Sequence, residues 1–159
     1  EGLASTIIGG WQFSSIFVAY SGTPLNILAS GTLNTPGNAL YADAVGEQKV
    51  LGGLGPGQQY LDKASYAIPA VGALGNMTRN GGPDGPGFWG IDSSLFKRFG
   101  FSGGRRFAEV RIDAFNLTNS VRWDNPNEAN RTVGSAAFGQ LNATVGGQRS
   151  LRFGGRLVF

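Results

Sequence analysis

The side chains that could carry chemistry are three carboxylates and two arginines in the second half of the chain. A glycosidase needs two carboxyl groups flanking the scissile bond, and Asp92, Glu109 and Asp113 are the candidates. A carboxylate beside an arginine stays ionised and makes a poor general acid. Opposite charges that face each other across neighbouring strands stabilise a sheet. We therefore expect a charge ladder on the wet side of a sheet, made of Asp92, Arg98, Glu109, Arg111 and Asp113.

The residues that other common catalytic and metal sites require are missing from the chain. The chain has no cysteine and no histidine, which excludes a disulfide framework, a Cys/His zinc site and a histidine general base. The glycines of 51–57 are not followed by the Lys-Ser/Thr of a phosphate-binding loop. We expect a protein that is not an enzyme and that holds no cofactor or metal.

Charge and hydropathy further limit the classes of protein to which the chain can belong. The 159 residues carry a net charge of +3, but only 14% are charged, against about 25% in an ordinary soluble domain. The basic residues of the second half alternate with acidic ones instead of forming a basic block, so we expect no nucleic-acid partner. No apolar run approaches the ~20 residues of a membrane-spanning helix.

Period-two alternation of apolar and polar residues predicts four strands. They cover about 7–20, 88–99, 106–117 and 149–159. The third strand has the clearest pattern, because four apolar residues share one face, expected to meet lipid or a core, and charged residues occupy the other. The four are Ala108, Val110, Ile112 and Ala114.

The predicted strands and their connections favour a membrane barrel over a soluble sheet. Soluble strands usually hold five or six residues, whereas ~9–11 residues cross a bilayer when tilted. The glycines of 100–104 predict a tight turn, while 21–86 and 118–148 are expected to be long loops. Short turns at one end and long loops at the other are typical of outer-membrane barrels. The predicted fold is all-β: antiparallel amphipathic strands with long loops, a partial segment of a large outer-membrane β-barrel, with residues 1–159 as one C-terminal barrel segment.

The last strand matches the signal by which outer-membrane proteins address the barrel-assembly machinery. It places a polar residue, a glycine, a hydrophobic residue and a terminal aromatic at Arg152, Gly154, Leu157 and Phe159. An amphipathic terminal strand of this kind can pair with an open sheet edge. We therefore expect the assembly machinery and outer-membrane lipid as partners.

Several segments, in order along nearly the whole chain, resemble the C-terminal barrel of Oar-like TonB-dependent receptors, which carry a carboxypeptidase-regulatory-like domain. They are Gly9–Leu25, Tyr60–Pro69, Gly75–Asn80, Gly85–Phe99, Arg111–Asn119, Phe138–Gly139 and the last strand.

The resemblance implies a transporter in the outer membrane of a Gram-negative bacterium. The C-terminus would be periplasmic, the long loops extracellular, the apolar face of the third strand against lipid and the charge ladder toward the lumen. Barrels of this type have about 22 strands and a plug. The plug and the TonB-contacting segment are missing from these residues, so TonB would act only through parts N-terminal to them.

Two alternatives stay open. Four strands with free edges and an apolar face would also suit a self-associating extracellular fibre or structural subunit that fills its edges by strand addition. A soluble carbohydrate-binding sandwich would use Trp89 or Trp123 as a stacking platform.

Overall fold

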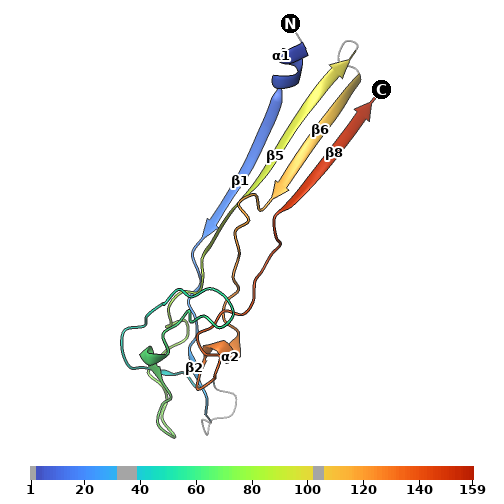
Figure 1. Ribbon diagram of the computed structural model, residues 1–159. Coiled ribbons are helices and arrows are strands. Elements are labelled where there is room, and N and C mark those ends of the chain that lie inside the picture. Colours follow the sequence, from blue (N-terminus) through green and yellow to red (C-terminus); the bar gives the residue numbers. More distant parts are fainter. Residues whose placement is uncertain (1–2, 32–38, 102–105) are drawn as a thin grey trace. The chain divides into compact units, whose positions relative to one another are not determined.

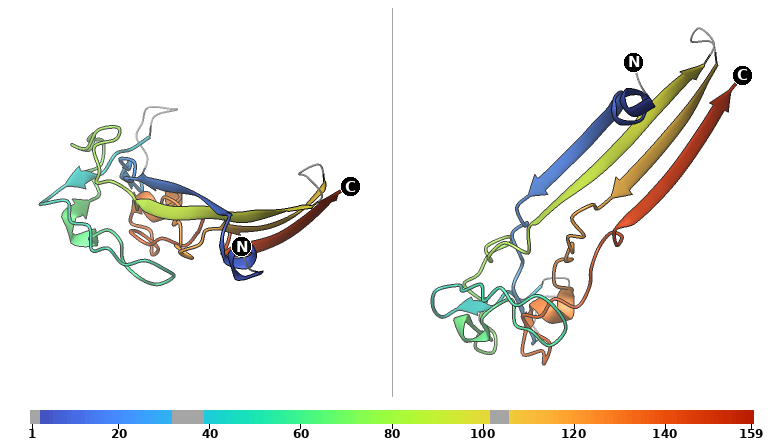
Figure 2. Two further views of the ribbon diagram at one scale, coloured as in Figure 1. Left: turned by 90° about the horizontal axis from the view of Figure 1, so that it is seen from above. Right: turned by 45° about the horizontal axis from the view of Figure 1, so that its top comes forward.

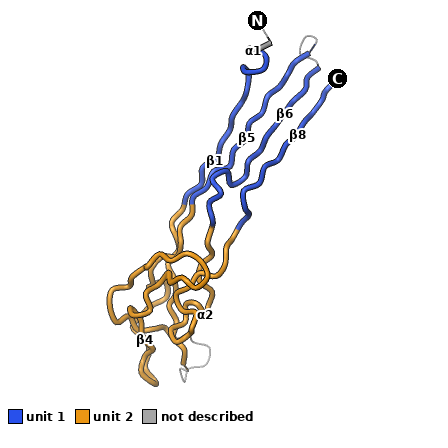
Figure 3. The backbone as a smooth tube through the Cα atoms, viewed as in Figure 1, with its two compact units in different colours: residues 1–19, 89–121, 146–159 blue, residues 20–88, 122–145 orange. Residues whose placement is uncertain are grey.

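The computed structural model describes residues 3–31, 39–101 and 106–159. The chain divides into two compact units (Figures 1 and 3). Unit 1 comprises residues 1–19, 89–121 and 146–159, and unit 2 comprises 20–88 and 122–145. Among the helices of the described part, none has the length and apolar character to span a membrane.

Unit 1 is a four-stranded sheet with one short helix. The helix α1 (Leu3–Ile8) precedes β1 (Trp11–Tyr20), and the other strands are β5 (Phe88–Phe101), β6 (Arg106–Phe115) and β8 (Ser150–Val158). The strand order is β1-β5-β6-β8. The arrows of β1 and β5 point in opposite directions in Figure 1, so the sheet is antiparallel throughout.

The register of the sheet is continuous from β5 to β8. Strand β5 pairs with β6 from Ser93↔Ala114 to Phe101↔Arg106. Strand β6 pairs with β8 from Phe107↔Val158 to Phe115↔Ser150. The alternating polarity of β6 selects this register, because a slip by one residue would turn its charged side chains to the apolar face.

The sheet is not covered by other parts of its own unit. All ten residues of β1 are exposed, as are eight of the nine in β8. Figure 2 shows the strands as a single layer, with only α1 lying at the start of β1. Since successive residues of a strand point to opposite faces, exposure along β1 and β8 means that both faces are open at these two strands.

The first predicted strand begins later than expected. Residues 3–8 form α1, and β1 starts only at Trp11, so the expected start near residue 7 is wrong. Gly10 has φ of 75°, a left-handed conformation that glycine adopts without steric cost. It ends the helix and reverses the chain into the strand.

The other predicted strands exist, with small differences at their ends. Strand β5 extends two residues beyond the expected 99, and β8 covers Ser150–Val158. Strand β6 ends at Phe115, before the expected 117, because Asn116 has φ of 50° and leaves the extended conformation. The expected tight turn at Gly103 and Gly104 lies outside the described residues.

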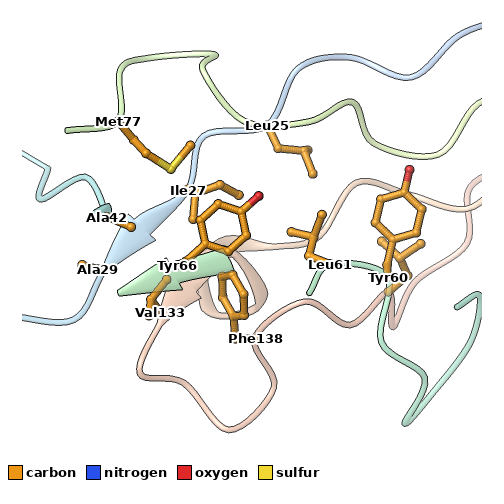
Figure 4. Packing of buried hydrophobic residues seen from close by; sticks show 11 residues of the cluster. Leu25, Ile27, Ala29, Ala42, Tyr60, Leu61, Tyr66, Met77, Val133 and Phe138 are labelled. Atoms are coloured by element: carbon orange, nitrogen blue, oxygen red, sulfur yellow. The ribbon is translucent and has the colours of Figure 1, made fainter. Parts of the chain in front are cut away.

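Unit 2 is built from the two segments expected to be long loops, and these segments fold together. Their apolar side chains form a buried cluster (Figure 4). Its largest fully buried members are Phe138, Ile27, Leu61 and Leu141. The other members are Leu25, Ala29, Ala42, Tyr60, Tyr66, Met77 and Val133.

Short elements and backbone hydrogen bonds hold unit 2 together. Strand β2 (Leu28–Ala29) pairs in parallel with β7 (Thr132–Val133), and β3 (Asp43–Ala44) pairs antiparallel with β4 (Tyr66–Ala67). The 3-10 helix η1 (Lys63–Ser65) is capped by Asp62, and α2 (Glu128–Arg131) is capped by Asn127. The β2–β7 pair joins the two loop segments directly.

Gly139 lies at a close contact between the two loop segments, where a side chain would collide with the backbone of the first segment. Its φ is 78°, and an added Cβ would lie 2.7 Å from the carbonyl oxygen of Leu61. Its own carbonyl accepts from the backbone N–H groups of Tyr60 and Leu61, and its N–H donates to Asn130. One glycine thereby ties the second loop segment to the first.

Candidate functional site

One face of the sheet is apolar across all four strands, and we call it the apolar face. The register aligns Ile112 of β6 with Leu95 of β5 and with Phe153 of β8. The hydroxyl of Ser15 lies 3.0 Å from that of Ser93, which places the odd-numbered residues of β1 on the same face. Its apolar members are Trp11, Phe13, Phe17, Leu95, Phe99, Ala108, Val110, Ile112, Ala114, Leu151, Phe153 and Leu157.

The opposite, polar face brings the predicted charge ladder together. Arg98 faces Glu109 across β5 and β6, with Nη2 and Oε2 3.0 Å apart. Arg111 contacts Asp113 at 2.8 Å, and Ser94 donates to the same carboxylate at 2.5 Å. Exposed ion pairs of this kind add little to stability, so their main effect is to keep this face of the sheet polar.

Two further arginines extend the ladder beyond the residues expected from the sequence. Arg156 of β8 pairs in register with Glu109, and Arg152 pairs with Asp113. Each carboxylate of β6 therefore lies between neighbouring strands that carry a cation or a hydroxyl. Asp92 has the parity of the same face of β5, and its carboxylate accepts from the backbone N–H of Asn116 at 2.7 Å.

Aromatic rings flank the charges on the polar face. The Arg98 guanidinium lies 4.4 Å from the centre of the Phe107 ring, and Arg156 lies 5.9 Å from the same ring. At the other end of β6, Arg152 lies 4.8 Å from the Phe115 ring. Cation–π contacts of this kind order long arginine side chains at exposed positions.

Both edges of the sheet are open. Strands β1 and β8 are the outer strands, and no other described segment pairs with their free edges. An exposed edge presents a row of unpaired N–H and C=O groups that bind another strand. The four strands therefore do not close into a barrel by themselves, and they form part of a larger sheet or barrel.

Residues 1–152 match a family model described as an outer membrane beta barrel domain. The chain belongs to this family. The barrel domain is therefore part of an outer-membrane protein, and the uncovered sheet is a segment of its barrel. No curated protein matches the chain, and no solved structure matches it.

Three residues of the expected assembly signal lie within β8, and the fourth, Phe159, follows it. Arg152 and Gly154 pair with Asp113 and Arg111 on the polar face, whereas Leu157 pairs with Ala108 on the apolar face. Phe159 follows β8 and is exposed. Because β8 is an edge strand, its outer backbone groups are available to another strand.

A corner of asparagines joins the end of β6 to the residues before β8, and it was not predicted from the sequence. Asn116 and Asn119 have φ of 50° and 52°, which asparagine tolerates better than most residues. The Asn116 side chain donates to the carbonyls of Ser120 and Gly147 and accepts from the Ser120 N–H. The Asn119 side chain accepts from the Arg149 N–H. The predictive signal was the spacing of asparagines directly after an alternating strand.

Unit 2 offers a folded surface and little chemistry. Burial raises the pKa of the Tyr66 phenol to about 12, with the Asp62 carboxylate adding to the shift. Burial also raises the pKa of Tyr60, whose hydroxyl donates to the Asp84 carbonyl at 2.9 Å. In the part of the chain that the structure describes, no group of three or more metal-ligating side chains gathers.

Proposed function

We propose that this chain is the C-terminal part of an Oar-like TonB-dependent receptor in the outer membrane of a Gram-negative bacterium. It contributes barrel strands and extracellular loops and is not itself an enzyme. The observation that carries the proposal is a sheet with one apolar and one charged face, uncovered on both sides, in a chain of the outer-membrane barrel family. The segments that resemble the receptor family support the finer assignment.

The proposed orientation puts the apolar face against lipid and the charge ladder toward the lumen. The opposite orientation would bury Arg98, Arg111 and their partners in hydrocarbon, at a cost of about 2–4 kcal/mol for each arginine at the bilayer midplane. The apolar face carries large exposed side chains, among them Phe13 and Phe153. Their transfer from water to lipid is favourable by about 25 cal/mol per Å² of apolar area.

The proposed topology follows from a periplasmic C-terminus. Strand β8 then runs toward the periplasm, and the connection between β5 and β6 is periplasmic. The two long connections, which follow β1 and β6, leave the opposite end of the sheet and are extracellular. In this topology unit 2 is an extracellular structure, which agrees with the long outer loops typical of these barrels.

The carboxylates support a structural role better than a catalytic one. Asp113 is held by Ser94 and Arg111, and Glu109 by Arg98. In a barrel of the proposed type such charges line the inner wall and contact water, substrate or plug. TonB and the transported substrate would be engaged through N-terminal parts of the receptor.

The assembly part of the proposal is tested with Phe159→Ala in the native protein. We expect a several-fold loss of the heat-modifiable, folded form in the outer membrane, because the terminal aromatic of β8 would be recognised by the barrel-assembly machinery. Leu151→Ala is the matched control, since it shortens an apolar side chain of β8 that does not belong to the expected signal. Equal amounts of folded protein in Phe159→Ala and wild type would contradict this role.

The receptor part is tested by the mass and the partner of the native product. Mass spectrometry of the outer-membrane fraction should find a protein several times larger than 16.6 kDa that ends at Phe159. The detergent-solubilised product should bind the purified periplasmic domain of TonB. A full-length product that does not bind TonB would overturn the receptor assignment and leave the barrel family intact.

The open edges favour one second candidate, a self-associating extracellular subunit. Strands β1 and β8 each present an unpaired edge among the described strands, and strand addition from a second copy would fill both. This candidate predicts a water-soluble product near 16.6 kDa that sediments as a polymer. A product found only in the outer membrane excludes it.

A further inference from the structure

One lysine lies on the apolar face of the sheet. Lys97 of β5 pairs in register with Val110 of β6, and its neighbours along the same face are Leu95 and Phe99. Only 3% of Lys97 is exposed. A buried ammonium group among apolar side chains needs hydrogen-bond acceptors, because an unpaired buried charge is strongly destabilising.

The acceptors come from α1 and the residues that follow it. The Lys97 ammonium donates to the carbonyls of Thr6 and Gly9 and, at 2.9 Å, to that of Ile7. These carbonyls lie at the C-terminal end of α1, where the last carbonyls of a helix have no N–H donors within the helix. The three donors of the lysine and the free carbonyls of the helix therefore satisfy each other.

Two aromatic rings complete the enclosure. The ammonium nitrogen lies 5.5 Å from the centre of the Trp11 ring and 4.9 Å from that of Phe99. The indole N–H of Trp11 donates to the Ile7 carbonyl at 3.1 Å. We call α1, Trp11 and Lys97 the lysine clasp.

The outside of the lysine clasp is apolar. Ile7 is 62% exposed and Ile8 is 76% exposed, and Trp11 is exposed beside them. All three polar N–H groups of the lysine point inward to carbonyls, so the clasp offers no free cation to an anionic partner. Exposed isoleucines beside an indole suit the boundary between headgroups and hydrocarbon, where amphipathic rings are enriched.

We propose that the lysine clasp is a membrane-interface anchor that lies in the headgroup layer at the end of the sheet where β1 begins. Lys97 is its positioning residue, because its hydrogen bonds hold the backbone of α1 at the apolar face while the isoleucine side chains stay exposed. The occupant of this surface is phospholipid, since the clasp continues the face proposed to meet lipid. The inference rests on that lipid contact, and the test below separates the two.

The absence of cysteine from the chain makes spin labelling a direct test. Ile8→Cys, in the native protein folded into phosphatidylcholine vesicles and cleared of any other cysteines, receives a nitroxide label. Its depth is measured from collisions with oxygen and with a water-soluble nickel complex. We expect a depth at the headgroup boundary. A label as exposed to nickel as one on a soluble loop would overturn the anchor.

A label at Ile112→Cys distinguishes failure of the anchor from failure of the proposed function. We expect this second label in the hydrocarbon. If it is there while the Ile8 label is in water, the anchor is wrong and the lipid contact of the apolar face stands. If the Ile112 label is itself in water, the proposed lipid contact fails.

The role of Lys97 is tested by Lys97→Met in the Ile8-labelled protein. Loss of the three hydrogen bonds should release α1, raise the mobility of the label and increase its collisions with nickel several-fold. Lys97→Arg keeps a cationic donor at this position, so the Ile8 label should lie closer to its wild-type depth than in Lys97→Met. The control Arg98→Met removes the neighbouring cation on the polar face and should leave the label unchanged. Equal spectra for Lys97→Met and wild type would overturn the positioning role.

Discussion

The two units of this chain place the same kind of side chain in opposite environments. Phe138 in unit 2 is 1% exposed, whereas Phe153 in the sheet of unit 1 is 75% exposed. Unit 2 buries a cluster of eleven residues, although it consists of loops with two-residue strands. The sheet has regular strands and a continuous register, yet it leaves its apolar face uncovered.

The difference shows that regular secondary structure and a protein core are separable. Unit 2 satisfies its apolar groups internally, as a soluble domain does. The sheet pairs its four strands in register but leaves its apolar groups to the surrounding solvent. In the orientation proposed for this outer-membrane barrel segment, that solvent is the bilayer on one face.

The largest expected effect comes from Phe138→Ala, which tests whether unit 2 depends on a water-excluded core. Removing a fully buried phenylalanine costs about 3–5 kcal/mol. We expect unit 2 to become sensitive to external protease while the barrel still inserts. Phe153→Ala is the control, because its exposed ring packs against no core and its loss should leave unit 2 resistant. Protease resistance in Phe138→Ala would show that the cluster does not hold the loops.

The next effect separates the two faces of one strand. Phe17 and Ile16 of β1 are 63% and 64% exposed, so arginine at either position would be equally tolerated in water. On the lipid side arginine costs about 2–4 kcal/mol at the midplane. We expect Phe17→Arg to lower the amount of folded protein in the outer membrane and Ile16→Arg to leave it near the wild-type amount.

Equal levels of the two β1 variants would contradict the idea that the sheet and unit 2 differ in the solvent around their apolar side chains. In that case the apolar face meets water or protein, and the sheet is not distinguished from unit 2 by its solvent. The levels are read from the heat-modifiable band on gels of the membrane fraction, normalised to total protein.

A smaller effect is expected at the asparagine corner that ends β6. Asn116→Ala removes the side-chain hydrogen bonds to Ser120 and Gly147 and puts alanine at φ of 50°. We expect a loss of about 1–3 kcal/mol, seen as a lower urea midpoint of the vesicle-inserted protein. Asn116→Gly relieves the backbone strain alone, so it should recover only part of the loss. Full recovery would mean that the side-chain bonds contribute nothing.

At neutral pH the last effect is absent, because it is a pH dependence of unit 2 that begins only above pH 10. The pKa of Tyr66 is raised from 10.0 to about 12 in the folded state. Below pH 10 the phenol is neutral in both states, and the stability is complete. Between pH 10 and 12 the unfolded phenol ionises first, so the free energy of unfolding falls by up to about 1.4 kcal/mol per pH unit. Protease resistance of unit 2 measured across this range should decline accordingly.

Tyr66→Phe sharpens the same prediction. The Tyr66 hydroxyl is buried without a hydrogen-bond partner among the described residues, so its removal should cost no stability at pH 7. The decline between pH 10 and 12 should become shallower. An unchanged slope would assign it to other groups, such as Tyr60, whose pKa is also raised.

The sheet was predictable from the sequence because each strand carries a local alternation of apolar and polar residues. The alternation of Ala108, Val110, Ile112 and Ala114 with charges fixes both the strand and its faces. The register that adds Arg152 and Arg156 to the ladder was not predictable, because pairing across strands depends on residues far apart in the sequence.

Unit 2 and the lysine clasp could not be predicted for a related reason. The cluster around Phe138 and Leu61 collects single apolar residues from two distant glycine-rich segments, and no local periodicity marks them. Lys97 has the parity of the apolar face, but only the fold of α1 supplies its acceptors. Contacts of this kind become visible only when the backbone of both partners is known.

The parallel pairing of β2 with β7 restricts how this protein can diversify. Surface loops usually accept insertions and substitutions freely. Here Leu28 lies opposite Thr132 and Ala29 opposite Val133, so a length change in one loop displaces its partner in the other. Sequence drift should therefore be confined to exposed stretches between the paired points, such as Val71–Leu74, which is a natural place to insert an epitope tag.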